Sequence, residues 1–347
     1  MRDNRITIIL LAIIAIVLLG FGLKCTREIF LPLVIAWLLS YILGPVVTFM
    51  VKRGVPVGIA VLAVLLVVLG GCFLGGVFLN GRMTEFVNAY PKYQARMESL
   101  IDTVTVNFGW LNNMLDSIDW GPRVGKFLMN LSTSFLVFMS QLVLVILFLV
   151  FMLLEKPFYN YKIKKAFSLR QGEKVTRVVN SISGQIGSYL FLQLVISLVT
   201  GFLVWLVLTI IGVDFAVTWG ALTFLFNFIP NIGPIIVSIP PILIALAQYY
   251  PNLWPAVITL VCLLSIHMII GNGIAPKVMG DRLDLSPVVI LISLLFWGWV
   301  WGVVGAIISV PIASAIKITC ENIKPLKPVS VMLGSGKGCR DRGIIRF

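Results

Sequence analysis

The sequence predicts an all-α, polytopic integral membrane protein with about six full spans and two helical hairpins broken by glycine and proline, or eight spans in total. Hydrophobic residues make up 59% of the 347-residue chain and charged residues 12%, whereas about a quarter of the residues of a soluble domain are charged. Several apolar runs reach the roughly 20 residues that a helix needs to cross a bilayer. These observations exclude an ordinary soluble domain. The net charge of +13 lies mainly in loops and tails, so we expect no nucleic-acid binding.

Six apolar runs are predicted to be full membrane spans. They are Ile6–Leu23, Ile29–Met50, Val57–Leu79, Leu131–Leu154, Ile186–Ile211 and Pro255–Gly271. The first run follows Arg2 and Arg5, and no small-residue cleavage site separates it from the next span. We therefore expect a retained signal anchor rather than a cleaved signal peptide.

Two further apolar segments, Phe215–Gln248 and Pro287–Lys317, are interrupted in the middle by glycine and proline. A continuous helix of about 30 residues would be about 45 Å long and would exceed the hydrocarbon core. We expect each segment to be a hairpin that enters and leaves by the same face, the two forming an inverted pair near the midplane. The alternative is one long kinked crossing for each segment.

The two interrupted segments also share a pattern, because Ile236–Pro240 aligns on Ile307–Pro311. Paired interruptions of this kind are typical of transporter binding sites, since a broken helix frees backbone polar groups inside the membrane. Such backbone is tolerated where it faces protein or a water-filled cavity. The alternative is a chance similarity between two ordinary kinked spans.

The distribution of Lys and Arg predicts which loops lie in the cytoplasm. Glu155–Gln185 carries seven basic residues against two acidic ones, and the chain after Ile316 carries seven against two. Both stretches are therefore placed inside, together with the N-terminus. The predicted organisation is 1–79 with three spans, 80–130 as an extracytoplasmic amphipathic helical region, 131–185 with the fourth span and a basic cytoplasmic helix, 186–325 as a transport half with both hairpins, and 326–347 as a basic cytoplasmic tail.

The outer region carries an apolar stripe with helical spacing that includes Tyr90, Tyr93 and Met97. Such a stripe predicts an amphipathic helix that lies on the membrane or packs on a partner subunit. A solvated helical cap with its own small core is the alternative.

Neutral polar residues and glycines near the breaks are the candidate lining of a substrate path. They are Asn227, Pro230, Asn231, Gly233 and Pro234 at the first break, Gly302 and Gly305 at the second, Gln193 in the fifth span, and Asn272 just after the sixth. Amides and freed carbonyls suit a small neutral polar solute, because they offer several hydrogen bonds without a titrating charge. For each amide taken singly, the alternative is a hydrogen bond between helices.

Titratable groups are scarce in the predicted spans, which bears on ion coupling. Asp214 lies at the outer edge of the first broken segment, and His267, the one histidine of the chain, lies within the sixth span. These two are the coupling candidates; the alternatives are a loop or capping role for Asp214 and a packing role for His267. The spacing of the five cysteines predicts no metal site, and no motif predicts a cofactor or an enzyme.

Several blocks of residues together resemble one family. The matching residues are Asn227–Pro234 with Ile239-Pro240, then Gly271-Asn272, Pro276–Gly280, Leu285-Ser286-Pro287, Phe296–Trp299, Gly302–Gly305 and Val310-Pro311. Over roughly residues 5–325 the chain resembles the autoinducer-2 exporter (AI-2E) family of bacterial inner-membrane permeases. That family commonly has an acidic residue where this chain has Gly271, which weakens any expectation of ion coupling there.

The resemblance implies a multi-pass, homo-oligomeric permease of the bacterial inner membrane with both termini cytoplasmic. Its expected function is that of a secondary transporter that exports a small polar metabolite such as autoinducer-2. A sodium/proton antiporter is the first alternative, which would add protons or sodium as partners. A non-transporting membrane scaffold or regulator is the second.

Overall fold

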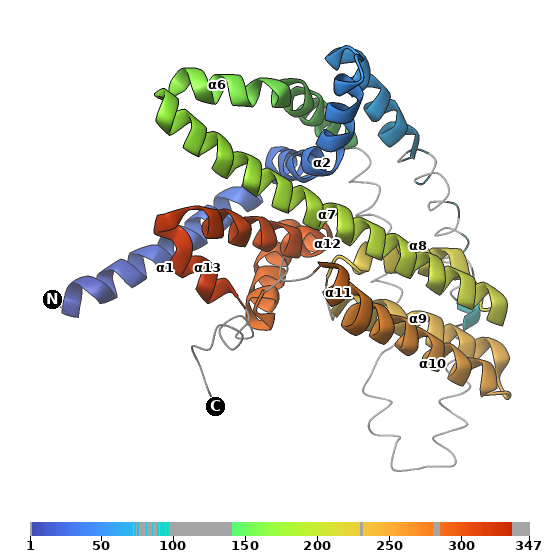
Figure 1. The fold of residues 1–347 in the computed structure, drawn as a ribbon. Helices are drawn as coiled ribbons and strands as arrows, with labels where there is room; N and C mark the ends of the chain where they lie inside the picture. The colour runs from blue at the N-terminus through green and yellow to red at the C-terminus, as the bar shows by residue number, and fades with distance from the viewer. Residues whose placement is uncertain are drawn as a thin grey trace. The chain divides into compact units, whose positions relative to one another are not determined.

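The computed structural model describes residues 2–71, 141–229, 232–279 and 285–334, with isolated residues between 73 and 96. Within these ranges the regular elements are helices (Figure 1), apart from one isolated bridge between Leu285 and Gly334. Six described helices are long and apolar enough to cross a membrane: Arg27–Lys52, Gln141–Phe158, Gln171–Ile211, Ile232–Tyr249, Trp254–Ile274 and Pro287–Asn322. The predicted all-α polytopic membrane fold is confirmed.

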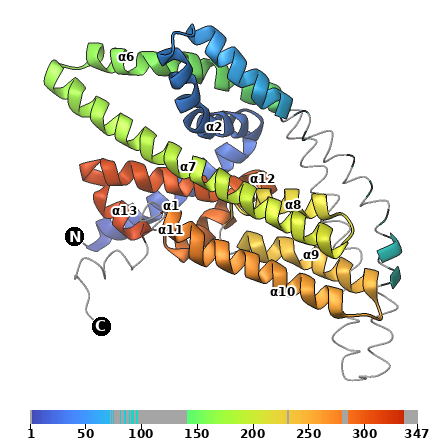
Figure 2. The same ribbon diagram turned by 45° about the vertical axis from the view of Figure 1, so that its right-hand side comes forward.

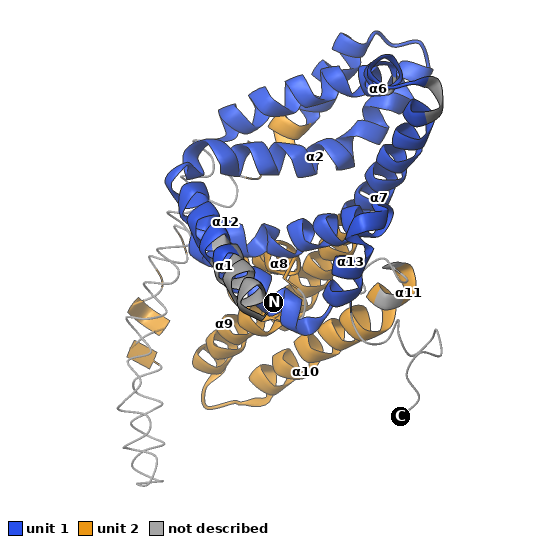
Figure 3. Ribbon diagram, turned by 90° about the vertical axis from the view of Figure 1, so that its left-hand side faces the viewer, with its two compact units in different colours: residues 1–67, 140–191, 281–347 blue, residues 68–139, 192–280 orange. Residues whose placement is uncertain are grey.

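The chain divides into two compact units (Figure 3). Unit 1 contains residues 1–67, 140–191 and 281–347, and unit 2 contains residues 68–139 and 192–280. The helix α7 (Leu169–Ile211) contributes to both. It extends the predicted fifth span, Ile186–Ile211, back to Leu169 without interruption, because the basic stretch before the span is helical as well. The predicted division by membrane side stays a prediction, and most of residues 80–130 lie outside the described ranges.

Unit 1 is built from helices that come from both ends of the chain. They are α1 (Arg2–Cys25), α2 (Arg27–Lys52), the apolar helix Val57–Gly71, the helix Gln141–Phe158 that ends in the 3-10 turn η2 (Lys156–Phe158), α6 (Tyr159–Ala166), the first part of α7, α12 (Pro287–Asn322), the turn η5 (Lys324–Leu326) and α13 (Lys327–Leu333). Trp301 on α12 donates its indole N–H to the carbonyl of Leu23 at 3.2 Å. This bond joins α1 to α12.

The helix α2 contains two prolines, Pro32 and Pro45, and proline is a common cause of helix kinks. In the turn before Pro45, the carbonyl of Ser40 accepts a hydrogen bond of 2.9 Å from the ammonium of Lys156. The lysine occupies the space beside Gly44, where a Cβ would overlap its Nζ. The glycine thus lets a cation reach the backbone of a proline-containing helix.

The second predicted break is present, and it makes α12 a helical hairpin. Gly302 has φ 68° and ψ −146°, a conformation open in practice to glycine. The hydroxyl of Ser293 donates to the carbonyl of Ser309 at 3.0 Å, although two residues 16 apart would be about 24 Å apart in a straight helix. The two arms therefore lie side by side. Gly305 permits their close approach, because a Cβ there would overlap the carbonyl of Trp297.

Unit 2 contains the first predicted hairpin and the sixth span (Figure 2). After the second part of α7 come α8 (Ala216–Phe226), α9 (Ile232–Tyr249), α10 (Trp254–Met268), a π-helix (Ile269–Ile274) and α11 (Ala275–Met279). The backbone N–H of Asp214, before α8, donates to the side chain of Gln248, at the end of α9, at 3.0 Å. The start of α8 and the end of α9 are therefore close together, so the two helices run antiparallel. That this pair enters and leaves the membrane by the same face stays a prediction. The sixth span leaves α-helical geometry at Ile269.

Glycines set the crossing of α7 and α8. A Cβ on Gly201 would lie 2.6 Å from the carbonyl oxygen of Gly220, and a Cβ on Gly220 would lie 2.6 Å from the Cβ of Trp205. Small residues at helix crossings bring backbones close enough for dispersion contacts, which drive helix association in lipid. This crossing holds the first hairpin against the long helix.

The α12 hairpin gives the first testable prediction. Gly305→Ala forces the two arms apart, since the added methyl meets the Trp297 carbonyl and lies 2.8 Å from the Trp301 Cβ. Such overpacking costs about 1–3 kcal/mol, and we expect a lower melting temperature of the purified protein in detergent. Gly298→Ala is the matched control, because its methyl would meet Ala306 at an ordinary 3.9 Å. Equal melting temperatures for the two variants would contradict the hairpin packing.

Candidate functional site

The first break places two of the predicted path residues in direct contact. The side-chain amide of Gln193 on α7 donates to the backbone carbonyl of Asn227 at 2.8 Å. The amide of Asn227 in turn donates to the hydroxyl of Ser197 at 3.1 Å. Gln193 and Ser197 are buried, and Asn227 is half-buried. A polar cluster of three residues therefore lies where α8 ends, in unit 2.

Ser197 was not among the predicted residues, although the sequence contains a signal for it. It follows Gln193 by four positions and precedes Gly201 by four, so all three lie on one face of α7. Gly201 is in contact with α8, which means that this face is the one turned toward the hairpin. The spacing of Gln193, Ser197 and Gly201 was therefore a signal in the sequence that Ser197 lies in the same interface as Gln193.

The rest of the first break packs tightly. Gly233 is buried, and a Cβ on it would overlap the carbonyl of Phe226. The carbonyl of Pro234 accepts a hydrogen bond of 2.7 Å from the hydroxyl of Ser238. Pro230 and Asn231 lie outside the described residues. The described part of the break is thus closed by internal contacts in this conformation.

Asn272 and His267 lie on the sixth span and its continuation. Asn272 is exposed in the π-helix Ile269–Ile274, and π-helical turns are frequent at functional sites. Both ring nitrogens of His267 are buried and have no hydrogen-bond partner among the described residues. The packing and coupling roles of His267 both stay predictions.

Asp214 belongs to a hydrogen-bond network at the turn between α7 and α8. Its carboxylate accepts a hydrogen bond from the hydroxyl of Tyr93, and its N–H binds Gln248. Gln248 also donates to the carbonyl of Gly212 at 2.9 Å, and Tyr249 donates to the carbonyl of Ile211 at 2.8 Å. The network links Tyr93 and the turn before α8 to the end of α9. These contacts support the loop role for Asp214.

The turn at Asp214 is strained, because the next residue, Phe215, has φ 61°. A bulky residue in the left-handed region persists where its surroundings hold it there. The ring of Tyr93 packs edge-on against Phe215 with centroids 6.1 Å apart. Burial raises the pKa of Tyr93, and the hydrogen bond and negative charge of Asp214 raise it further. The tyrosine therefore stays a neutral donor.

Gly302 and Gly305 lie in the α12 hairpin of unit 1, whereas Asn227 and Gln193 lie in unit 2. Gly302 forms the reversal and Gly305 the close contact described above. Their predicted role in a substrate path stays a prediction.

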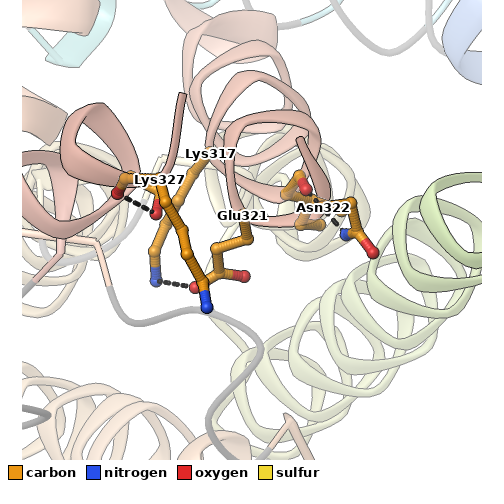
Figure 4. A network of polar contacts seen from close by, with 6 residues as sticks. Lys317, Glu321, Asn322 and Lys327 are labelled. Carbon is orange, nitrogen blue, oxygen red and sulfur yellow. Dashed lines mark hydrogen bonds and ion pairs between the residues drawn. The ribbon is translucent and has the colours of Figure 1, made fainter. Parts of the chain in front are cut away.

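One charged residue in unit 1 was missed as a candidate. Lys317 on α12 is 4% exposed and lies 3.8 Å from the carboxylate of Glu321, one turn later (Figure 4). In the sequence, Lys317 counts among the basic residues that indicate the cytoplasmic side, at the end of a broken segment. The useful signal was its i,i+4 spacing from a glutamate within a helical pattern, which predicts pairing rather than solvation. Close by, Ser181 of α7 donates to Asn322 at 3.1 Å.

Comparison with known proteins now decides the family. A model described as "AI-2E family transporter" matches residues 7–324. The chain belongs to the AI-2E transporter family. The resemblance found in the sequence is thereby confirmed, and so is its implication of a multi-pass membrane transporter for a small solute.

Individual relatives agree with this assignment over nearly full length. The chain is 33% identical to the "Putative transport protein" of Borreliella burgdorferi over 93% of this chain and 90% of the relative. It is 32% identical to "Putative transport protein YhhT" of Escherichia coli K12 over 95% of each chain. It is also 31% identical to "AI-2 transport protein TqsA" of the same strain over 94% of each chain.

The Tyr93–Asp214 contact gives the second prediction. Tyr93→Phe removes a hydrogen bond to a charged group, which is worth about 1.5–3 kcal/mol. Because the folded-state pKa of Tyr93 is raised above its ordinary value near 10, this stabilisation is complete below pH 10 and is lost as the pH rises further. We therefore expect the same drop in melting temperature throughout pH 6–9.

The control for this prediction is Tyr161→Phe, since Tyr161 is an exposed tyrosine on α6. We expect it to melt like the unchanged protein. A Tyr93→Phe protein as stable as the control would show that the outer region is not held by this bond.

Proposed function

We propose that the protein is a secondary transporter that exports a small neutral polar solute, such as autoinducer-2, across the bacterial inner membrane. The observation that carries the proposal is the cluster of Gln193, Asn227 and Ser197 at the broken end of α8. Its amides and hydroxyl are neutral and lie where a helix ends, with Gln193 and Ser197 buried and Asn227 half-buried. The relative TqsA, whose name is "AI-2 transport protein", supports this class of solute.

In the proposed mechanism the cluster exchanges internal hydrogen bonds for bonds to the solute. The side-chain NH2 of Gln193, which donates to the Asn227 carbonyl in this structure, would donate instead to an acceptor atom of the solute. The carbonyl of Asn227 would then accept a hydrogen bond from a solute hydroxyl. The side-chain NH2 of Asn227 would likewise donate to the solute and give up its hydrogen bond to the hydroxyl of Ser197. Loss of the solute restores the internal bonds, so the protein's own contacts compete with cargo and favour its release.

Orientation and assembly complete the proposal. The excess of basic residues in 155–185 and after Ile316 supports cytoplasmic placement of both stretches and of both termini. The exposed apolar surfaces of the described spans support contact with lipid and with further copies of the chain in a homo-oligomer. The two hairpins are proposed to be re-entrant.

A sodium/proton antiporter is the second candidate, and one observation favours it. His267 is buried without a described partner, and an ionisable group of this kind inside a membrane protein is commonly kept for function. Asp214 is less suited to coupling, because its carboxylate is held by Tyr93.

The third prediction tests the cluster. The full-length protein is reconstituted in liposomes, and uptake of labelled autoinducer-2 is followed. We expect Asn227→Ala and Gln193→Ala each to lower the initial rate by about tenfold, since each removes a hydrogen bond to the solute worth about 1.4 kcal/mol. Asn180→Ala, which removes an exposed amide from the same long helix, is the matched control and should transport normally. Normal flux through both cluster variants, with unchanged melting temperatures, would refute the site.

The fourth prediction separates exporter from antiporter. Under the proposed function, adding sodium to liposomes that carry a pH gradient leaves the gradient in place, and His267→Gln leaves solute uptake unchanged. Sodium-dependent collapse of the pH gradient that His267→Gln abolishes would establish the antiporter instead.

A further inference from the structure

A basic and aromatic segment follows the helix Gln141–Phe158 in unit 1. This segment, Lys156–Phe167, comprises the turn η2, α6 and the next residue, and is called here the α6 segment (Figure 1). It contains four lysines and no acidic residue. Three of its aromatic side chains are well exposed: Phe158 by 54%, Tyr161 by 66% and Phe167 by 47%. A short helix of this composition directly after an apolar span lies at the depth where hydrocarbon meets headgroups.

One face of the α6 segment is hollowed. The hollow has a volume of about 490 Å³ and is lined by Phe158, Tyr161, Lys162, Lys165 and Ala166. Residues 158, 162 and 165 fall on one helical face, because they are spaced by four and three positions. Two aromatic side chains and two lysine side chains thus line the same open space, and most of its lining is apolar.

The four lysines of the segment differ in their contacts. Lys156 turns inward to the carbonyl of Ser40, and Lys162 forms an ion pair with Glu155. The side chains of Lys164 and Lys165 are exposed. After the one acidic neighbour is paired, the exposed surface of the segment keeps a net positive charge.

We propose that the α6 segment binds an anionic glycerophospholipid of the leaflet that it faces. The lipid phosphate lies beside Lys165 and Lys162, where it replaces the exposed carboxylate of Glu155 as the partner of Lys162. The glycerol and upper acyl carbons lie against Phe158 and Tyr161. Charge complementarity selects the anionic headgroup, because juxtamembrane lysines are attracted to anionic lipid. The aromatic rings select a ligand with an apolar part, which a free phosphate ion lacks. Continuity with the span Gln141–Phe158 keeps the hollow at the membrane surface, where lipid is the available partner.

This inference does not rest on transport, and its test is a binding measurement. The full-length protein is reconstituted in phosphatidylcholine vesicles that contain a small fraction of phosphatidylglycerol with a photoreactive group near the glycerol. After illumination, crosslinked peptides are mapped by mass spectrometry. We expect crosslinks within residues 157–166, and we expect Lys162→Gln/Lys165→Gln to reduce them by about fivefold for each lysine removed.

The matched control is Lys174→Gln/Arg177→Gln, which removes the same charge from exposed positions on α7. It should leave the crosslinks in 157–166 unchanged. Excess unlabelled phosphatidylglycerol should compete, whereas excess phosphatidylcholine or inorganic phosphate should not. Ion pairs on an exposed surface contribute little stability, so the double variant is expected to fold, and its melting temperature checks this.

Three results would overturn the proposal. Equal crosslinking by a phosphatidylcholine probe would show that the lysines do not select an anionic headgroup. Competition by inorganic phosphate would show that the site binds anions without a lipid tail. Protein–protein crosslinks from the same segment, in place of lipid, would show that a second copy of the chain covers it.

Discussion

A backbone carbonyl inside a membrane has to find a donor within the protein, and this constraint organises the described structure. Helices that end or bend in apolar surroundings leave such carbonyls behind. Here several of them are met by a side chain from another element. Trp301 donates to Leu23 at the end of α1. Tyr249 donates to Ile211 at the end of α7, and Gln193 donates to Asn227 at the end of α8. Each interruption of a helix is therefore also a link between elements.

Close backbone approach is the second requirement of the same architecture. Lipid offers no hydrophobic drive for helices to associate, so contacts depend on fit. Gly305 beside the Trp297 carbonyl and Gly233 beside the Phe226 carbonyl let two hairpins close on themselves. Gly201 and Gly220 let α8 approach α7.

Much of this architecture could be predicted from the sequence, because its signals are local. Apolar length marked the spans, and glycine with proline marked both breaks within a few residues. The contacts of the site could not be predicted in the same way. Tyr93 and Asp214 are 121 positions apart, and no local pattern states that they meet. Lys317 was read as a charge at a membrane edge, whereas its burial depends on how α12 folds back and packs. Gln193 was found by its polarity, but its partner Asn227 became evident through the fold.

The cluster at the broken end of α8 also restricts the chemistry of the proposed cargo. When Gln193 leaves the carbonyl of Asn227, that carbonyl is buried without a donor, which costs about 1–3 kcal/mol. A solute relieves this cost if it supplies a donor to the carbonyl and, at hydrogen-bond distance, an acceptor for the freed amide. A hydroxyl next to a carbonyl or a second hydroxyl meets both demands, whereas a bare cation meets one and leaves the amide unpaired. Under the proposed function, the bond that holds α7 to α8 would favour neutral polyhydroxy compounds, because the protein gives up its internal hydrogen bond most easily to a ligand that replaces both the donor and the acceptor.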